Sequence, residues 1–235
     1  MKIRGRRECR DCGHRWSYYE TGEVSCPACG SLRSRGTDER TRHTDSPATL
    51  DLSDHRSSFE DAPAEEFADD LKRTLREYRR KRGFVSGGRL RDLDDTFLAT
   101  GELLHAVDVY GRARDRSDEE DLYLLDLLRG ADTGDRPAPD RVPASMRAAR
   151  GAGYAESLLA YRRDVATYLD DKPDPAARRV LGTLRERVKR VEALQGDVSP
   201  ESMEALVRAA RDLGAAIRED DETALATASD RLDDW

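Results

Sequence analysis

The four cysteines of this chain stand in two pairs within the first thirty residues, and each pair has the spacing Cys-x-x-Cys. The pairs are Cys9 with Cys12 and Cys26 with Cys29. A structural zinc ion takes four ligands in a tetrahedron, and each pair offers two sulfurs from one tight turn. The pattern predicts one Zn²⁺ per chain. Because four sulfurs close the shell, the site is expected to stabilise the fold and not to catalyse a reaction.

Iron in a rubredoxin-like centre is the alternative metal, because turns of the Cys-Pro-x-Cys-Gly type occur at both kinds of site. A disulfide framework is not expected, since the cysteines are confined to the paired pattern and no apolar signal segment precedes them. The chain also has no apolar run long enough to cross a bilayer. These features together predict a cytoplasmic protein without a membrane partner.

Charge divides the chain into two unlike parts. Residues 1–36 carry eight basic and four acidic side chains, a net charge of +4, whereas the whole chain has −7, so the remainder carries −11. A basic segment with aromatic residues is a familiar device for binding nucleic acid or its protein machinery. The side chains expected to make such contacts are Arg4, Arg6, Arg7, Arg10, Arg15, Trp16 and Tyr18.

Each of these contacts has a simpler interpretation that the sequence leaves open. Arginine supplies nearly all the positive charge of this chain, so the arginines could be ordinary solvated surface residues. Trp16 and Tyr18 alternate on an expected strand over 15–19. They could pack over the metal site as a miniature core, or form an exposed platform on which bases stack.

The expected fold is mainly α, with a small N-terminal β zinc ribbon followed by an all-α bundle of six or seven helices. We expect a ribbon over 1–36, a polar linker over 37–61 and an acidic helical bundle over 62–235. The linker has one short apolar patch at Leu50 and Leu52 that could dock on a neighbouring surface. Apolar residues at spacings of three and four recur from about residue 67 to the end.

Local signals predict where several of these helices begin. Ser117 with Glu120 forms a capping box, and Asp174-Pro175 and Ser199-Pro200 are typical first residues of helices. The second helix is expected to include Leu90 and Leu93, and the third to bury Leu122, Leu125 and Leu128. The C-terminal helices have heptad-like spacing, which would allow a homo-oligomer.

The one enzyme-like feature of the helical part is Glu102 with His105, whose spacing places both side chains on one helix face. Carboxylate-bridged metal bundles require a second pair of this kind, and the sequence has none. No glycine-rich phosphate loop, nucleophile elbow or Ser/His/Asp arrangement is visible either. The chain is therefore not expected to be an enzyme.

The segments Glu8–Gly13 and Ser25–Gly30 resemble the zinc ribbon of archaeal and eukaryotic transcription initiation factor B and of related ribbons in the transcription machinery. The whole chain resembles a family of uncharacterised proteins from halophilic archaea that join such a ribbon to a helical tail. The resemblance implies that the four cysteines bind zinc in a small three-stranded unit. It covers the factor only over the first thirty to forty residues and does not extend to its paired cyclin-like repeats, so promoter recruitment is not carried over.

The leading hypothesis is a zinc-binding, non-enzymatic adaptor or regulatory protein. Its ribbon would contact transcription or other nucleic-acid machinery, and its helical domain would mediate protein contacts. Two alternatives belong to other classes: a helical-domain enzyme or ligand-binding protein with a purely structural ribbon, and a scaffold that dimerises through its C-terminal helices. A pocket lined by titratable groups around Glu102 and His105 would favour the enzyme, whereas a solid apolar core there would argue against it.

Overall fold

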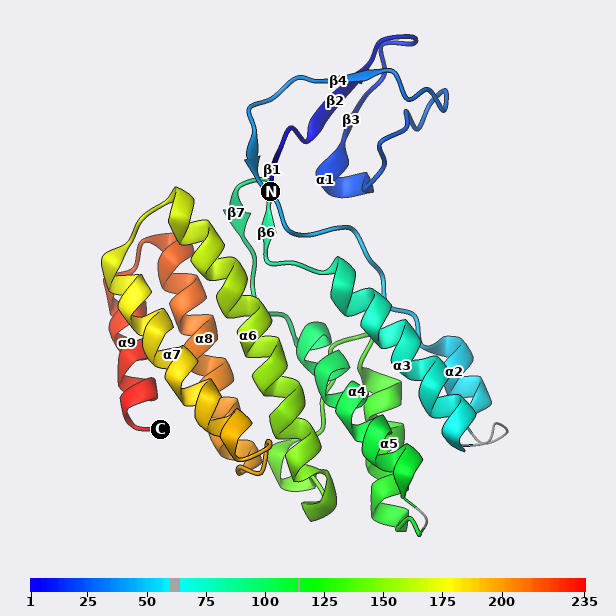
Figure 1. Ribbon diagram of the computed structural model, residues 1–235, viewed down its shortest axis with the longest axis vertical. Coiled ribbons are helices and arrows are strands. Elements are labelled where there is room, and N and C mark those ends of the chain that lie inside the picture. The colour runs from blue at the N-terminus through cyan, green and yellow to red at the C-terminus, as the bar shows by residue number, and fades with distance from the viewer. Residues whose placement is uncertain (60–63, 114) are drawn as a thin grey trace.

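The computed structural model describes residues 1–59, 64–113 and 115–235, and the mainly α fold expected from the sequence is confirmed (Figure 1). Within these ranges no helix is both long enough and apolar enough to cross a membrane. Two short helices and two 3₁₀ turns accompany the long helices in the described part. The long helices are α3 (Ala64–Lys81), α4 (Asp95–Arg112), α5 (Asp118–Gly130), α6 (Arg147–Asp171), α7 (Pro175–Ala193), α8 (Pro200–Glu219) and α9 (Glu222–Asp233).

The helix starts predicted from local signals are confirmed. The Ser117 hydroxyl accepts from the Glu120 amide while the Glu120 carboxylate accepts from the Ser117 amide, which completes the capping box of α5. The Asp174 carboxylate accepts from the first amides of α7, where Pro175 takes the first position, and Ser199 caps α8 in a similar way. These contacts satisfy backbone donors that have no partner within the helix.

The strands are short and mostly lie in the first 42 residues. A three-stranded antiparallel sheet has the order β3-β2-β4, and two further strand pairs are β1 with β5 and β6 with β7. The bounds are β1 (Lys2–Ile3), β2 (Arg6–Cys9), β3 (Arg15–Ser17), β4 (Ser34–Gly36), β5 (Thr41–Arg42), β6 (Val85–Ser86) and β7 (Arg89–Leu90).

Three details of the sequence prediction are wrong. The strand expected over 15–19 ends at Ser17, and the short helix α1 (Tyr18–Thr21) follows it. Leu90 and Leu93 precede the second long helix, because the Asp94 side chain caps α4 by accepting from an amide in its first turn. On α5, Leu128 is buried as expected and Leu125 is half-buried, but Leu122 is 61% exposed and the helix buries Tyr123 and Leu124 in its place.

The segment that follows the three-stranded sheet runs along the helical part. Its amides and carbonyls bond to β6 and to the end of α3, as in the bonds from the Thr44 amide to the Val85 carbonyl and from the Ser46 amide to the Lys81 carbonyl. Leu52 is fully buried in the main core, just before α2 (Ser53–Ser58). The boundary expected between residues 61 and 62 lies outside the described residues.

The main core is continuous from the apolar residues before α2 to Leu232 of α9. Helix α6 lies at its centre and contacts α4, α7 and α8. Close approach of α4 and α6 depends on two glycines, since a Cβ on Gly153 would lie 2.4 Å from the carbonyl oxygen of Gly101. The heptad-like residues of α8, such as Met203 and Leu213, are buried in this same core.

The N-terminal sheet stands over one end of the helices (Figure 1). Lys2 and Arg42 both pair with Asp171 at the end of α6. The buried ring of His43 lies against Tyr18 and Tyr19, with a centroid distance of 4.8 Å to Tyr19, and its Nδ1 accepts from the amide of Gly87 in the β6–β7 turn.

Candidate metal centre

Two loops with the same backbone hydrogen bonds carry the four cysteines. In the first loop the Cys9 carbonyl accepts from the Gly13 amide at 3.1 Å, and in the second the Cys26 carbonyl accepts from the Gly30 amide at 2.8 Å. Gly13 and Gly30 have φ angles of +73° and +74°, a left-handed conformation that side chains with a Cβ rarely adopt. A glycine directly after each pair therefore allows the turn to close.

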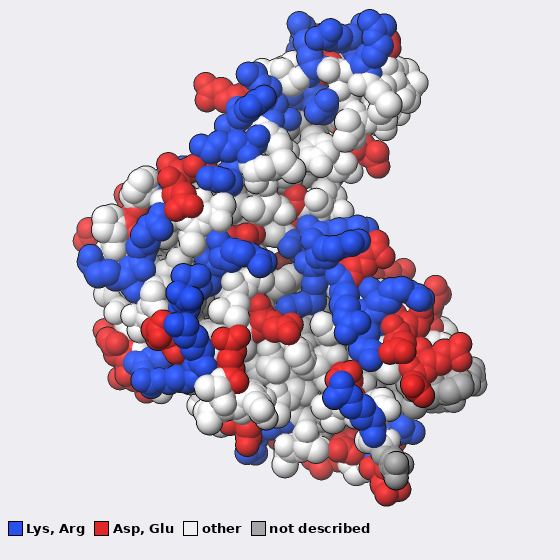
Figure 2. Space-filling model, in the orientation of Figure 1, with Lys and Arg blue, Asp and Glu red and all other residues white. Residues whose placement is uncertain are grey.

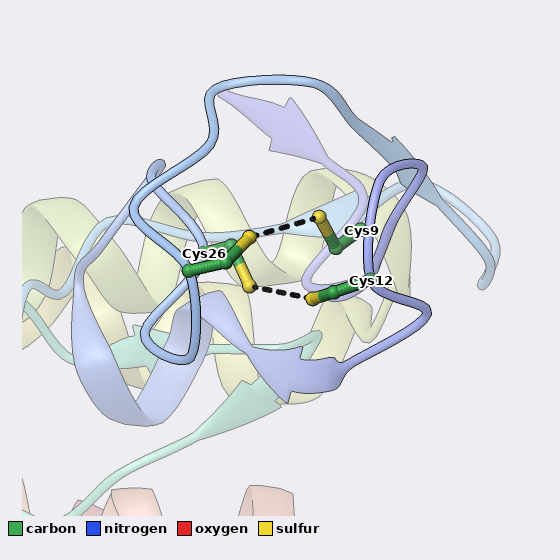
Figure 3. Close-up of side chains that lie close together, drawn as sticks. Cys9, Cys12 and Cys26 are labelled. Atoms are coloured by element: carbon green, nitrogen blue, oxygen red, sulfur yellow. Dashed lines mark hydrogen bonds between the residues drawn. The ribbon is translucent and has the colours of Figure 1, made fainter.

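The four sulfur atoms converge between these loops and lie within 4.8 Å of one another. Figure 3 shows Cys9, Cys12 and Cys26 pointing into one space, where Sγ of Cys9 lies 3.7 Å from Sγ of Cys29 and Sγ of Cys12 lies 3.6 Å from Sγ of Cys26. A tetrahedron with Zn–S bonds of about 2.3 Å has edges of about 3.8 Å. A disulfide needs about 2.05 Å. The cluster is therefore compatible with zinc and not with disulfides.

The thiols of Cys9 and Cys29 differ in how readily they ionise. Backbone amides of Cys12 and Asp11 stabilise the Cys9 thiolate and lower its pKa to about 7. The Ser31 amide has the same effect on Cys29, but the neighbouring cysteines and burial outweigh it and raise its pKa to about 12. Four adjacent thiolates repel one another, so all four ionise together only when a metal ion balances their charge.

Trp16 belongs to the small core beside the sulfurs. Its side chain is 8% exposed and clusters with Cys9 and Cys26, and its indole N–H donates to the Glu23 carbonyl oxygen at 3.0 Å. Tyr18 is partly exposed and presents its ring to His43. Of the two interpretations left open by the sequence, the miniature core therefore describes Trp16, whereas Tyr18 lies outside that core.

Most arginines of the N-terminal segment already have partners. Glu8 binds Arg15 and Arg35 from the two neighbouring strands, and the Arg35 guanidinium, more than any other group, lowers the pKa of Glu8. The remaining contacts are Arg33 with Asp11, Arg7 with the Ser34 hydroxyl and Arg4 with the Asp38 carbonyl. Arg6 and Arg10 are exposed and make no side-chain contact of this kind with the described residues. Figure 2 shows how Lys and Arg gather on this part of the molecule.

Comparison with known proteins places the chain in a family. A model of the family of unknown function DUF7117 matches residues 1–232. The chain belongs to this family. The DUF7117 match covers both the paired cysteines and the long helices. Comparison with curated proteins and with solved structures finds no match.

Glu102 and His105 of this DUF7117 chain do not form a common site. Glu102 is fully buried and pairs with Arg150 at 3.0 Å, whereas His105 is partly exposed and faces Glu156 at 3.2 Å. Both residues lie on α4, but their partners are on different parts of α6.

Sequence reasoning missed a network of buried charges around Glu102. The Glu102 carboxylate also accepts from the Tyr123 hydroxyl, and Arg150 continues the network to Glu204 at 2.7 Å. Glu204 in turn binds Arg136, whose loop precedes α6. The sequence feature that could have indicated this network is the position of Glu102, which lies one turn after Leu98 and one turn before Ala106 on the buried face of α4. A charge in an apolar register predicts a buried partner.

A cleft of about 1260 Å³ opens between the N-terminal sheet and the helices. Asp45 lies at its floor and accepts from Arg82, Arg91 and the Gly83 amide, and Arg82 also pairs with Asp94. These charged groups therefore satisfy one another. The cleft is also lined by Arg6, Glu20, Glu39 and Arg89, which form no ion pair with the described residues.

Proposed function

We propose that this protein is a zinc-dependent, non-enzymatic adaptor. In this proposal the four cysteines hold one Zn²⁺ in a closed shell that maintains the N-terminal unit as a ribbon, and the ribbon presents a partner-binding surface. The observation that carries the proposal is the convergence of four sulfurs at tetrahedral spacing on a unit whose own core is only Cys9, Trp16 and Cys26. Such a unit depends on metal to fold.

Arg6 and Arg10 are the proposed partner contacts, because they are exposed and free of ion pairs with the described residues. A protein of the transcription or other nucleic-acid machinery is the proposed partner. This choice follows the likeness of the cysteine segments to transcription-type ribbons and the positive charge of the first 36 residues. The halophilic origin and the cytoplasmic location belong to the same proposal and rest on composition and cysteine usage.

The absence of catalysis is also proposed. It is supported by the different partners of Glu102 and His105 and by the mutual pairing of Asp45, Arg82 and Asp94 at the floor of the cleft. A dimer through α8 is not proposed, because the heptad-like side chains of that helix pack inside the chain's own core.

Crosslinking in an extract at matched salt tests the adaptor role. The full-length protein is compared with the Arg6→Gln/Arg10→Gln variant and with Arg129→Gln/Arg208→Gln, which removes two exposed arginines of α5 and α8 that form no ion pair with a described residue. We expect defined partners to be lost only with the Arg6 and Arg10 change. A partner set that is identical for all three proteins would refute the proposal.

A further inference from the structure

The most basic long helix of this acidic chain is α7. Its 19 residues carry six basic and two acidic side chains, a net charge of +4, whereas α3 comes next with +1. Figure 2 shows Lys and Arg gathered over α7 and the adjoining face of α6. Since the residues after position 36 together carry −11, this concentration runs against the charge of its surroundings.

One row of basic residues on α7 borders α6. Arg178, Arg185 and Lys189 are separated by seven and four residues, so they lie on one face of the helix. Helices α6 and α7 are joined by three residues and run antiparallel, and the pair between Asp170 and Arg178 at 2.9 Å fixes their register. Two turns further along, this register sets Arg162 of α6 against Arg185. We call these four basic residues the α6–α7 seam.

The pair of Arg162 and Arg185 is unusual because two like charges face each other. Neither forms an ion pair with a described residue, and Nε of Arg162 is buried without a hydrogen-bond partner there. Burial, together with the charge of Arg185, lowers the pKa of Arg162. The like charges repel each other, and an anion bound between the two guanidiniums would relieve that repulsion.

The surface around the seam is open. Gly182, between Arg178 and Arg185, is exposed, and a Cβ there would meet no atom within 4 Å. The large exposed apolar side chains of the described residues lie elsewhere, the nearest along the chain being Leu194 just after α7. Protein interfaces have an apolar centre that is poor in charge, so the chemistry of the seam fits phosphate groups better than a protein surface.

We propose that the α6–α7 seam binds the phosphate backbone of a nucleic acid. The row from Arg178 to Lys189 spans about 16 Å along the helix axis, the length of about five nucleotides on one strand of a duplex. Arg162 and Arg185 together grip one phosphate. Arg178 and Lys189, which pair with Asp170 and Glu186 in the unbound chain, contact its neighbours. Because no aromatic side chain is exposed on the seam, binding is independent of base sequence. The seam is separate from the ribbon and does not depend on the ribbon's partner.

Fluorescence anisotropy with the full-length, zinc-loaded protein tests this proposal. The probes are a duplex of about 20 base pairs as DNA and as RNA, with polyglutamate of equal charge for comparison. We expect the Arg162→Gln/Arg185→Gln variant to weaken duplex binding roughly tenfold at about 0.1 M salt. It should also reduce the slope of log K against log salt by about 2. Loss of binding to only one of the duplexes identifies that nucleic acid as the ligand.

Matched variants distinguish binding at the seam from binding at the ribbon and from a general effect of net charge. Arg129→Gln/Arg208→Gln makes the same change in charge and should leave the slope unchanged. The seam variant should melt at the same or a higher temperature than the wild type, because a like-charge pair has been removed. The proposal would be overturned by no duplex binding at about 0.1 M salt, by an equal loss in the control variant, or by polyglutamate binding that is as tight and as sensitive to the seam variant. Binding abolished only by Arg6→Gln/Arg10→Gln would assign nucleic acid to the ribbon and also refute the seam.

Discussion

Removal of the metal should unfold the N-terminal unit and leave the helices in place. Trp16 is 8% exposed in a core that it shares only with Cys9 and Cys26, whereas the helices belong to a separate, continuous core. Burying one tryptophan contributes about 3–5 kcal/mol. Zinc in a site of this kind contributes about 10–16 kcal/mol of apparent binding free energy. The metal is therefore the dominant stabilising term of this unit, and the predicted Kd lies between about 50 nM and about 2 pM.

The assay follows the fluorescence of Trp16 in a Trp235→Phe background, where it is the single tryptophan. We expect a chelator to shift the emission to longer wavelength, added Zn²⁺ but not Mg²⁺ to restore it, and far-ultraviolet circular dichroism to keep most of its helical signal. Cys26→Ser should behave like the chelated protein. Unchanged emission after the metal is shown to be gone would refute the reasoning, and so would simultaneous loss of the helical signal.

Three further predictions concern the helices and their junction with the N-terminal sheet. Gly153→Ala should lower the free energy of unfolding in urea titrations by about 1–3 kcal/mol, because a Cβ there would lie 2.4 Å from a backbone carbonyl oxygen of α4. Gly182→Ala should raise it by up to about 1 kcal/mol, because a Cβ there meets no atom within 4 Å and alanine favours the helix. Glu102→Ala should lower the free energy of unfolding by about 3–5 kcal/mol, because Arg150 stays buried without one of its two carboxylate partners. The double variant Glu102→Leu/Arg150→Met should recover most of that loss, and a double variant as unstable as Glu102→Ala would contradict this prediction. Burial lowers the pKa of His43, so the unfolded chain binds the proton more readily than the folded protein does, and the free energy of unfolding should fall as the pH drops below about 6.5. NMR titration of the His43 ring measures this pKa, and a midpoint at or above about 6.5 would disprove the prediction.

Local chemistry explains which parts of the fold could be predicted from the sequence. The capping box at Ser117 and the cap at Asp174-Pro175 involve hydrogen bonds between residues a few positions apart, so neighbouring residues in the sequence predict where these helices begin. The same is true of the glycine that follows each cysteine pair. The α5 face was predicted wrongly because Leu122 and Leu124 are equally apolar, and only the position of neighbouring helices decides which of them is buried.

Contacts between distant residues could not be predicted in this way. Glu102 and Arg150 are separated by 48 positions, and their pairing depends on the close crossing of α4 and α6. The path of residues 37–59 along the helices is likewise set by long-range bonds, such as that from the Thr44 amide to the Val85 carbonyl. At the cysteine site the sequence predicted the ligands but not the environment of Trp16, because alternation along a strand does not say which face is covered.

X-ray absorption at the zinc K-edge, on protein purified without added metal, tests the central claim most directly. We expect zinc surrounded by four sulfurs at about 2.3 Å, with no nitrogen or oxygen in the first coordination shell. A protein without zinc, or zinc with a light-atom ligand in place of one sulfur, would contradict it.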